Sequence, residues 1–183
     1  MVVLQHEIPL ETVHYVIEFC YEKGIKIVLN PAPAAAVPME IIDKVTYVTP
    51  NEHEAVLIFG DELSTEDLLR KYPEKLVITQ GSRGVSTCLK DGQILNVPAR
   101  KAQVVDTTGA GDTLNGAFSV QIAEGKAIED ALAYANVAAS LSTEKFGAQT
   151  GMPTAEEVET ALKILNGESV EKEIPVEMEL ITK

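Results

Sequence analysis

The sequence predicts an α/β fold in three layers, with helices on both faces of a mostly parallel sheet that ends in a β-hairpin. Short apolar runs alternate with longer segments of helical periodicity over the first eighty residues, which is typical of βαβ units. Farther along, the pair Asp91-Gly92 separates two apolar runs at hairpin spacing. Parallel units followed by a hairpin indicate a mixed sheet.

Length and composition favour one soluble globular domain. The chain has 183 residues, of which 45% are apolar and 23% charged, with a net charge of −13. That charge argues against nucleic acid or an anionic membrane as a partner. No apolar run reaches the about 18 residues of a membrane span, and no basic leader is present. Cys20 and Cys88 lie far apart, without ligand spacing, so we expect reduced thiols and a cytoplasmic protein.

The first thirty residues predict a βαβ unit with a right-handed crossover. Residues 2–4 form an apolar strand, Pro9 opens a helical pattern that ends at Gly24, and 25–29 form the next strand. The proline-rich segment 30–34 follows at the carboxyl end of that strand, where open α/β sheets bind ligands. It is either a plain turn or part of such a site.

Capping signals and periodicity define the following elements. Asn51 and Glu54 have capping-box spacing and start a helix that runs to Gly60, and Thr154 with Glu157 start the last helix in the same way. The other predicted elements are helices at 38–45, 64–72 and 127–145, strands at 46–49, 75–79, 85–89 and 94–97, and an acidic tail at 167–183 in which 174–181 could form a strand.

A glycine-rich turn at 106–112 lies between a strand end at Val104-Val105 and a helix that begins at Ala110. Such a turn leaves N–H groups free at the helix start, where the macrodipole also favours an anion. Asp112 in the first turn is either an ordinary helix cap or an acid that handles a proton during phosphoryl transfer. The apolar face is predicted to contain Leu114, Ala117, Phe118, Gln121 and Ile122, with Asn115 and Ser119 on the opposite face.

The string DTTGAGD at 106–112 resembles the C-terminal signature of the ribokinase-like (PfkB) family of sugar and nucleoside kinases. The resemblance extends over about 4–158, and NPAPA together with GAQ favours ribokinase over adenosine kinase or fructokinase. The other strings that carry it are, in order, ExPLE at 7–11, NPAPA at 30–34, TPNEHEA at 49–55, VITQGSRGV at 77–85 and FGAQ at 146–149.

The resemblance implies an ATP-dependent sugar kinase that converts D-ribose into D-ribose 5-phosphate. Asp112 would take the proton from the primary hydroxyl of the sugar, and Glu7 would contact the sugar. Glu54 would hold Mg²⁺ through water, an arrangement that suits this ion. The anion hole that stabilises the transferred phosphoryl group would be the N–H groups of Gly109, Ala110 and Gly111.

Further contacts are implied for ATP and for a monovalent cation, K⁺. Asn136 is open to a second interpretation, as a solvent-facing position on its helix. At Gly151 ribokinases usually supply a serine hydroxyl, so that cation ligand is missing or replaced by Thr150. The implied nucleotide contacts are Asn51, Thr79, Gly81, Gly84 and Asn136. The implied cation ligands are Asp106 and Thr108, with the carbonyls of Ser142, Lys145 and Gly147.

The resemblance concerns the C-terminal part of the family fold, so we expect the N-terminal strands and the lid to be absent. Residues 1–166 would be the nucleotide-binding side of the kinase core. Three functions stay open: a sugar kinase for ribose, or for fructose or a nucleoside; a nucleotide-binding fragment without activity of its own; and half of a split enzyme. The partners would be ATP and a sugar, with a homo-oligomer or a complementing N-terminal half.

Overall fold

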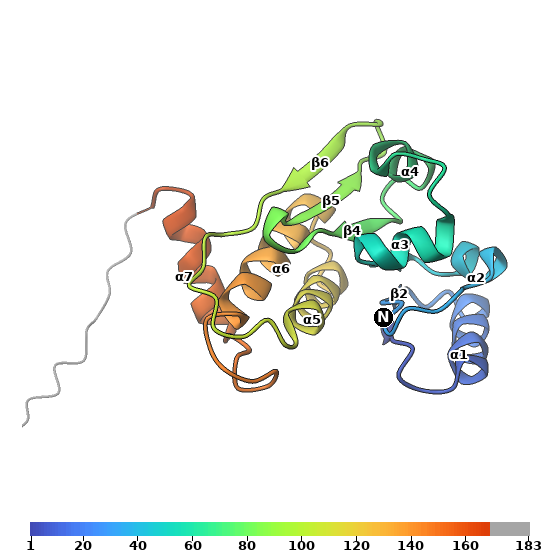
Figure 1. Ribbon diagram of the computed structural model, residues 1–183, viewed down its shortest axis with the longest axis horizontal. Helices are drawn as coiled ribbons and strands as arrows, with labels where there is room; N and C mark the ends of the chain where they lie inside the picture. The colour runs from blue at the N-terminus through green and yellow to red at the C-terminus, as the bar shows by residue number, and fades with distance from the viewer. Residues whose placement is uncertain (169–183) are drawn as a thin grey trace, which may run out of the picture.

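The computed structural model describes residues 1–168, and its strands form two three-stranded sheets that isolated bridges join into one mixed arrangement (Figure 1). β1, β2 and β3 pair in parallel, with Val3 opposite Val28. Two isolated parallel bridges, Val48 to Leu76 and Asn51 to Thr79, join this group to β4, after which β5 and β6 pair antiparallel. The predicted mostly parallel sheet with a hairpin is therefore confirmed. The strands are β1 (Val2–Leu4), β2 (Ile27–Leu29), β3 (Tyr47–Val48), β4 (Val77–Thr79), β5 (Val85–Cys88) and β6 (Ile94–Val97).

The helices cover both faces of this sheet, which confirms the three layers. One hydrophobic core packs helices α1, α2, α3 and α4 against one face of the sheet, and a second core packs α5 and α6 against the other face. Helix α7 packs on the outer side of α6. Both predicted capping boxes are present, at the starts of α3 and α7. The helices are α1 (Leu10–Glu22), α2 (Met39–Lys44), α3 (Glu52–Phe59), α4 (Thr65–Lys71), α5 (Ala110–Ala123), α6 (Ile128–Ser142) and α7 (Ala155–Leu165), with a 3₁₀ turn, η1 (Gly81–Arg83), after β4.

The three residues of β2 show how the sheet separates the two cores. Ile27 and Leu29 belong to the core beneath α1 and α2, whereas Val28 belongs to the core beneath α5 and α6. Successive side chains of a strand point to opposite faces, so a strand buried on both faces is apolar throughout. The continuous run Ile27–Leu29 has this composition, and all three side chains are fully buried.

Phe118 of α5 is the largest fully buried side chain of the second core and stacks edge-on against Tyr47, with ring centroids 5.1 Å apart. Asn115 and Ser119, which were predicted to lie on the face of α5 opposite its apolar residues, are both buried. Asn115 accepts a hydrogen bond of 2.5 Å from the Thr49 hydroxyl, which ties α5 to the residue after β3. Its environment is polar although it is buried.

The segment between β6 and α5 is a loop, so the predicted strand end at Val104-Val105 is wrong. Both valines are 62% exposed, and the Val105 N–H donates to the Thr143 carbonyl at the end of α6 instead of to a strand. This segment is therefore bonded to the end of α6 and not to a strand of the sheet. The strand suggested at 174–181 lies outside the described residues.

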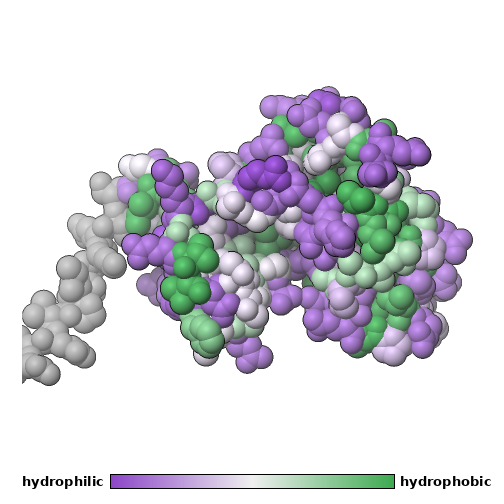
Figure 2. Space-filling view, in the orientation of Figure 1, coloured by the Kyte–Doolittle hydropathy of each residue, from purple (hydrophilic) through white to green (hydrophobic). Residues whose placement is uncertain are grey.

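The surface is mainly polar, in keeping with the net charge of −13 (Figure 2). Apolar surface is visible over α3, where Val56 and Leu57 are about half exposed. Within residues 1–168, no helix has the length and apolar character needed to cross a membrane.

Candidate active site

The turn before α5 is built around Gly109. Its φ of 78° lies in the left-handed region that glycine tolerates. A Cβ at this position would also lie 2.9 Å from the Ala148 Cβ, so the space excludes a side chain as well. The Ala110 N–H donates to the Thr107 carbonyl within the turn. The N–H groups of Gly109 and Gly111 donate to no other group in the described part of the chain, so they are available to an anion.

Asp112 lies in the first turn of α5 with an exposed side chain. One of its oxygens, Oδ1, accepts a hydrogen bond of 2.6 Å from the Gln5 side-chain amide. Oδ2 has no partner among the described residues, so it can accept a proton from a substrate. Glu7 is exposed two residues beyond Gln5, on the segment that follows β1. The sequence reasoning missed Gln5, because no local pattern connects residues 107 positions apart.

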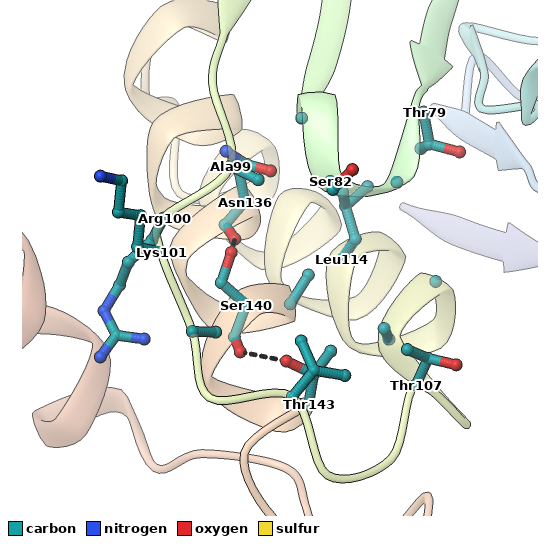
Figure 3. A pocket seen from close by; sticks show the side chains of 17 residues that line it. Thr79, Ser82, Ala99, Arg100, Lys101, Thr107, Leu114, Asn136, Ser140 and Thr143 are labelled. Carbon is teal, nitrogen blue, oxygen red and sulfur yellow. Dashed lines mark hydrogen bonds between the residues drawn. The ribbon is translucent and has the colours of Figure 1, made fainter.

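A cavity of about 650 Å³ opens beside this turn (Figure 3). It lies between the turn after β4, the start of α5, the C-terminal half of α6 and the loop 99–104. Most of its side chains are small or apolar, which suits a flat aromatic base. Four of the five predicted nucleotide contacts line it and Asn51 does not. The lining residues include Thr79, Gly81, Gly84, Gly111, Leu114 and Asn136.

Asn136 is 4% exposed, so the solvent-facing interpretation is wrong. Its Nδ2 donates to the carbonyls of Val97, at 3.3 Å, and Pro98, at 2.7 Å. The amide thereby holds the end of β6 against the middle of α6. A polar residue among alanines is explained by its donation to these two carbonyls.

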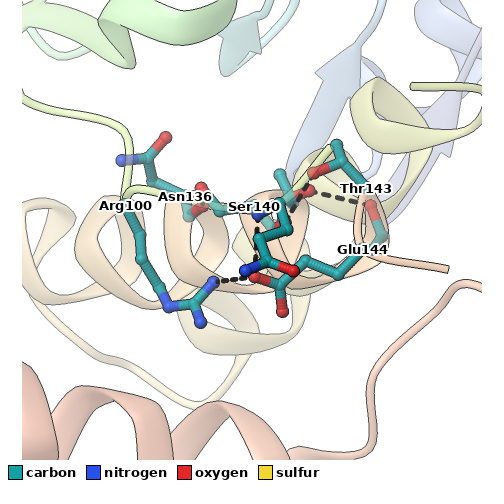
Figure 4. A network of polar contacts seen from close by, with 8 residues as sticks. Arg100, Asn136, Ser140, Thr143 and Glu144 are labelled. Atoms are coloured by element: carbon teal, nitrogen blue, oxygen red, sulfur yellow. Dashed lines mark hydrogen bonds and ion pairs between the residues drawn. The ribbon is translucent and has the colours of Figure 1, made fainter. Parts of the chain in front are cut away.

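The loop that forms the outer wall of the cavity is fixed to α6 at a second place (Figure 4). Arg100 and Glu144 form a partly buried ion pair of 2.9 Å, and Glu144 also accepts a weaker hydrogen bond from the Gln103 N–H. The side chains of Arg100 and Lys101 point away from the cavity (Figure 3). The loop therefore contributes backbone and aliphatic surface to the wall, and not its charges.

Asn51 and Glu54 cap α3, and Glu54 is 7% exposed. The Asn51 N–H donates to Glu54 Oε2 at 2.8 Å, and the Glu54 N–H donates to Asn51 Oδ1 at 2.9 Å. Among the described residues, no group of three or more His, Cys, Asp or Glu could hold a metal ion. A divalent cation here would be bound by one carboxylate oxygen, water and the oxygens of a ligand, as Mg²⁺ is in nucleotide sites.

Asp106 joins the turn before α5 to the loop after α6. Oδ1 accepts from the Thr108 N–H and Oδ2 from the Gly147 N–H, both at 2.9 Å. The Thr108 hydroxyl and N–H, followed by the Gly147 N–H, hold the pKa of Asp106 below its usual value. The carboxylate is thus ionised and links two loops that lie 41 residues apart.

The loop after α6 contains a cluster of carbonyl oxygens around the buried Gly151. A Cβ added to Gly151 would lie 2.7 Å from the Ser142 oxygen, 2.8 Å from the Gly147 oxygen and 3.5 Å from the Lys145 oxygen. Three carbonyls converging on one small space can coordinate a monovalent cation. The Thr150 hydroxyl donates to the Phe146 carbonyl at 2.5 Å, and the Lys145 ammonium pairs with Glu157.

The comparisons with known proteins identify the family of this chain. The profile of the pfkB family carbohydrate kinases matches residues 2–155. The chain belongs to this family. Ribokinase of Bacillus subtilis is 53% identical over 162 residues, which cover 88% of this chain and 55% of that protein. Ribokinase of Lactococcus lactis is 50% identical over 166 residues, or 90% of this chain and 54% of the relative.

Solved structures show the same fold. The structure of Arabidopsis thaliana ribokinase complexed with ribose and ATP has a TM-score of 0.80 at 31% identity. The match covers 88% of this chain and 55% of that one. This pfkB family chain therefore spans about half the length of the relatives it matches.

Proposed function

We propose that the chain carries the nucleotide side and the catalytic base of an ATP-dependent ribokinase, which converts D-ribose and ATP into D-ribose 5-phosphate and ADP. The observation that carries the proposal is the position of Asp112. Among residues 1–168, the exposed Asp112 carboxylate has one oxygen without a partner and lies beside the N–H groups of Gly109 and Gly111, which donate to no other group there, next to the cavity. The names of the relatives, and ribose and ATP in the Arabidopsis complex, support the choice of substrates.

In the proposed reaction, Oδ2 of Asp112 takes the proton of the sugar's primary hydroxyl, and the oxygen of that hydroxyl attacks the γ-phosphorus of ATP. The bond from the γ-phosphorus to the β–γ bridging oxygen breaks and ADP leaves. The N–H groups of Gly109 and Gly111 stabilise the charge on the transferred phosphoryl group, while the Ala110 N–H closes the turn. Glu7 binds a hydroxyl of the sugar.

ATP in this site would be bound through the lining residues Thr79, Gly81, Gly84 and Asn136. When bound, Mg²⁺ neutralises charge on the phosphates, and Glu54 would hold it through water. Asn51 would act from the same cap, beside the lining residue Thr79, with which it forms an isolated bridge.

K⁺ would be held by the carbonyls of Ser142, Lys145 and Gly147, together with Asp106 and Thr108. The missing side chain at Gly151 leaves the space that the ion needs. Gly151 has no side-chain hydroxyl to offer as a ligand, and the Thr150 hydroxyl already donates its hydrogen to the Phe146 carbonyl. The ion would stabilise the turn before α5 without touching the substrates.

In this proposal residues 1–166 form the nucleotide-binding part of the kinase core, and the enzyme works in the cytoplasm. A second candidate is a nucleotide-binding part that turns over sugar only together with a complementing N-terminal half or within a homo-oligomer. The observation that favours it is the edge strand β1, which pairs on one side only, with Val3 44% exposed. Such an edge can add a strand from another chain.

The test measures ADP release with ribose, fructose and adenosine as acceptors, and ATP affinity by calorimetry. We expect ribose to give the highest kcat/KM. Asp112→Asn should lower kcat by about 10²- to 10⁴-fold, the usual contribution of a general base, with ATP affinity unchanged because Asp112 does not line the cavity. Asp130→Asn, in the first turn of α6, is the matched control and should leave kcat unchanged.

Each alternative has its own result. ATP binding without turnover on any acceptor would support the nucleotide-binding candidate, and turnover restored by an added N-terminal polypeptide would support the split enzyme. Full activity of Asp112→Asn would refute the assignment of the base.

A further inference from the structure

We infer that Gln5 is a positioning residue for the base, an inference that rests on the proposed function of Asp112. Its Nε2 lies 2.6 Å from Asp112 Oδ1, across 107 residues of sequence. This is the only side chain that reaches Asp112 among the hydrogen bonds of residues 1–168. The contact connects the segment after β1 to the first turn of α5, two elements that lie side by side (Figure 1).

The backbone on both sides of Gln5 is held in place. The Asn30 N–H donates to the Leu4 carbonyl, and the His6 N–H donates to the Ala32 carbonyl, at 2.9 and 2.8 Å. The His6 ring is 8% exposed and lies 3.3 Å from the Pro33 carbonyl through Nδ1. Gln5 therefore extends from a fixed segment, and its amide reaches Asp112 from a defined direction.

The hydrogen bond between Gln5 and Asp112 is suited to orienting the Asp112 carboxylate. An exposed aspartate rotates freely about its side-chain bonds unless a neighbour holds it. Donation from an amide to Oδ1 fixes the plane of the carboxylate and leaves Oδ2 for the proton of the substrate. The donor is neutral at every working pH, and a hydrogen bond to an ionised acceptor is stronger than one between neutral groups.

Two substitutions at Gln5 distinguish the effect of its hydrogen-bond donor from the effect of the size and shape of its side chain. Gln5→Glu keeps the size and removes the donor, whereas Gln5→Lys changes the shape and keeps a donor. We expect Gln5→Glu to lower kcat by about tenfold or more, since small misplacements of a catalytic group have effects of this size. Gln5→Lys should retain more activity than Gln5→Glu. The KM for ATP should change less than twofold in both variants, and Gln121→Ala on α5 should behave as the parent protein.

A second measurement does not depend on turnover. In ¹⁵N–¹H spectra of the whole chain, the side-chain amide signals of Gln5 should move toward random-coil positions in Asp112→Ala, while those of Gln121 stay in place. Gln5 signals that are the same with and without Asp112 would overturn the inference, and so would Gln5→Glu with parental kcat. A chain that does not turn over ribose, but in which the Gln5 signals move, would refute the proposed function and support the contact that the inference needs.

Discussion

Replacing Gly109 by alanine tests whether the turn before α5 is as constrained as its geometry indicates. The φ of 78° places alanine in the left-handed region, at a cost of about 1–2 kcal/mol. The new Cβ would also meet the Ala148 Cβ at 2.9 Å and its Cα at 3.0 Å, and overpacking of this kind costs about 1–3 kcal/mol. The combined loss is about 2–5 kcal/mol, unless the turn unwinds and relieves it.

The assay combines urea denaturation with ATP calorimetry. Gly109→Ala should lower the free energy of unfolding by the stated amount, or bind ATP more weakly because the N–H groups have moved. Gly116→Ala is the matched control on the same helix, with no atom within 4 Å of its Cβ and no positive φ. It should raise stability, by up to about 1 kcal/mol. If Gly109→Ala matched the parent protein in both stability and ATP affinity, the steric argument for this turn would be refuted.

Three further predictions concern the core, the cavity wall and pH. Phe118→Ala should cost about 3–5 kcal/mol in urea denaturation, whereas Phe146→Ala, at an 80% exposed position, should change stability by less than about 0.5 kcal/mol. Asn136→Ala removes the hydrogen bonds that hold the Val97 and Pro98 carbonyls to α6, so calorimetry should show weaker ATP binding and melting a lower Tm. Burial lowers the pKa of His6 below 6.5, despite the opposing effect of the Pro33 carbonyl. The contribution of the neutral His6 ring to the free energy of unfolding is therefore complete above about pH 6.5, and it is lost as the pH falls toward the lower pKa of the folded state. The Tm should drop on acidification, less steeply in His6→Gln than in His53→Gln, and equal slopes would contradict this.

The order of the elements was predictable because local signals determine it. The capping boxes at Asn51 and Thr154 each need only four residues, and both are present. Apolar runs of three residues between helical segments were enough to place β1 and β2. The glycine turn before α5 was equally legible, since a left-handed residue followed by a helix is a local event.

Contacts between distant segments were not predictable in this way. The burial of Asn115 could not be predicted locally, because its partner, the Thr49 hydroxyl, lies 66 residues away. The burial of Asn136 was unpredictable for the same reason, since the carbonyls to which it donates belong to Val97 at the end of β6 and to Pro98 after it. Val104 is apolar, which suggested a strand, but it lines the cavity instead. In the site, Gln5 reaches Asp112 only because the sheet brings the end of β1 to the start of α5.

The carboxylate of Asp106 has a consequence for how the protein responds to its solution. Since its two oxygens hold the turn before α5 and the loop after α6, whatever orders one loop lowers the entropic cost of ordering the other. Linkage makes this effect reciprocal: an ion that tightens nucleotide binding must itself bind more tightly when nucleotide is present, by the same factor. With a monovalent cation bound as proposed, nucleotide affinities measured in sodium, potassium or caesium salts should therefore differ, and their ratios should report the coupling between the two loops.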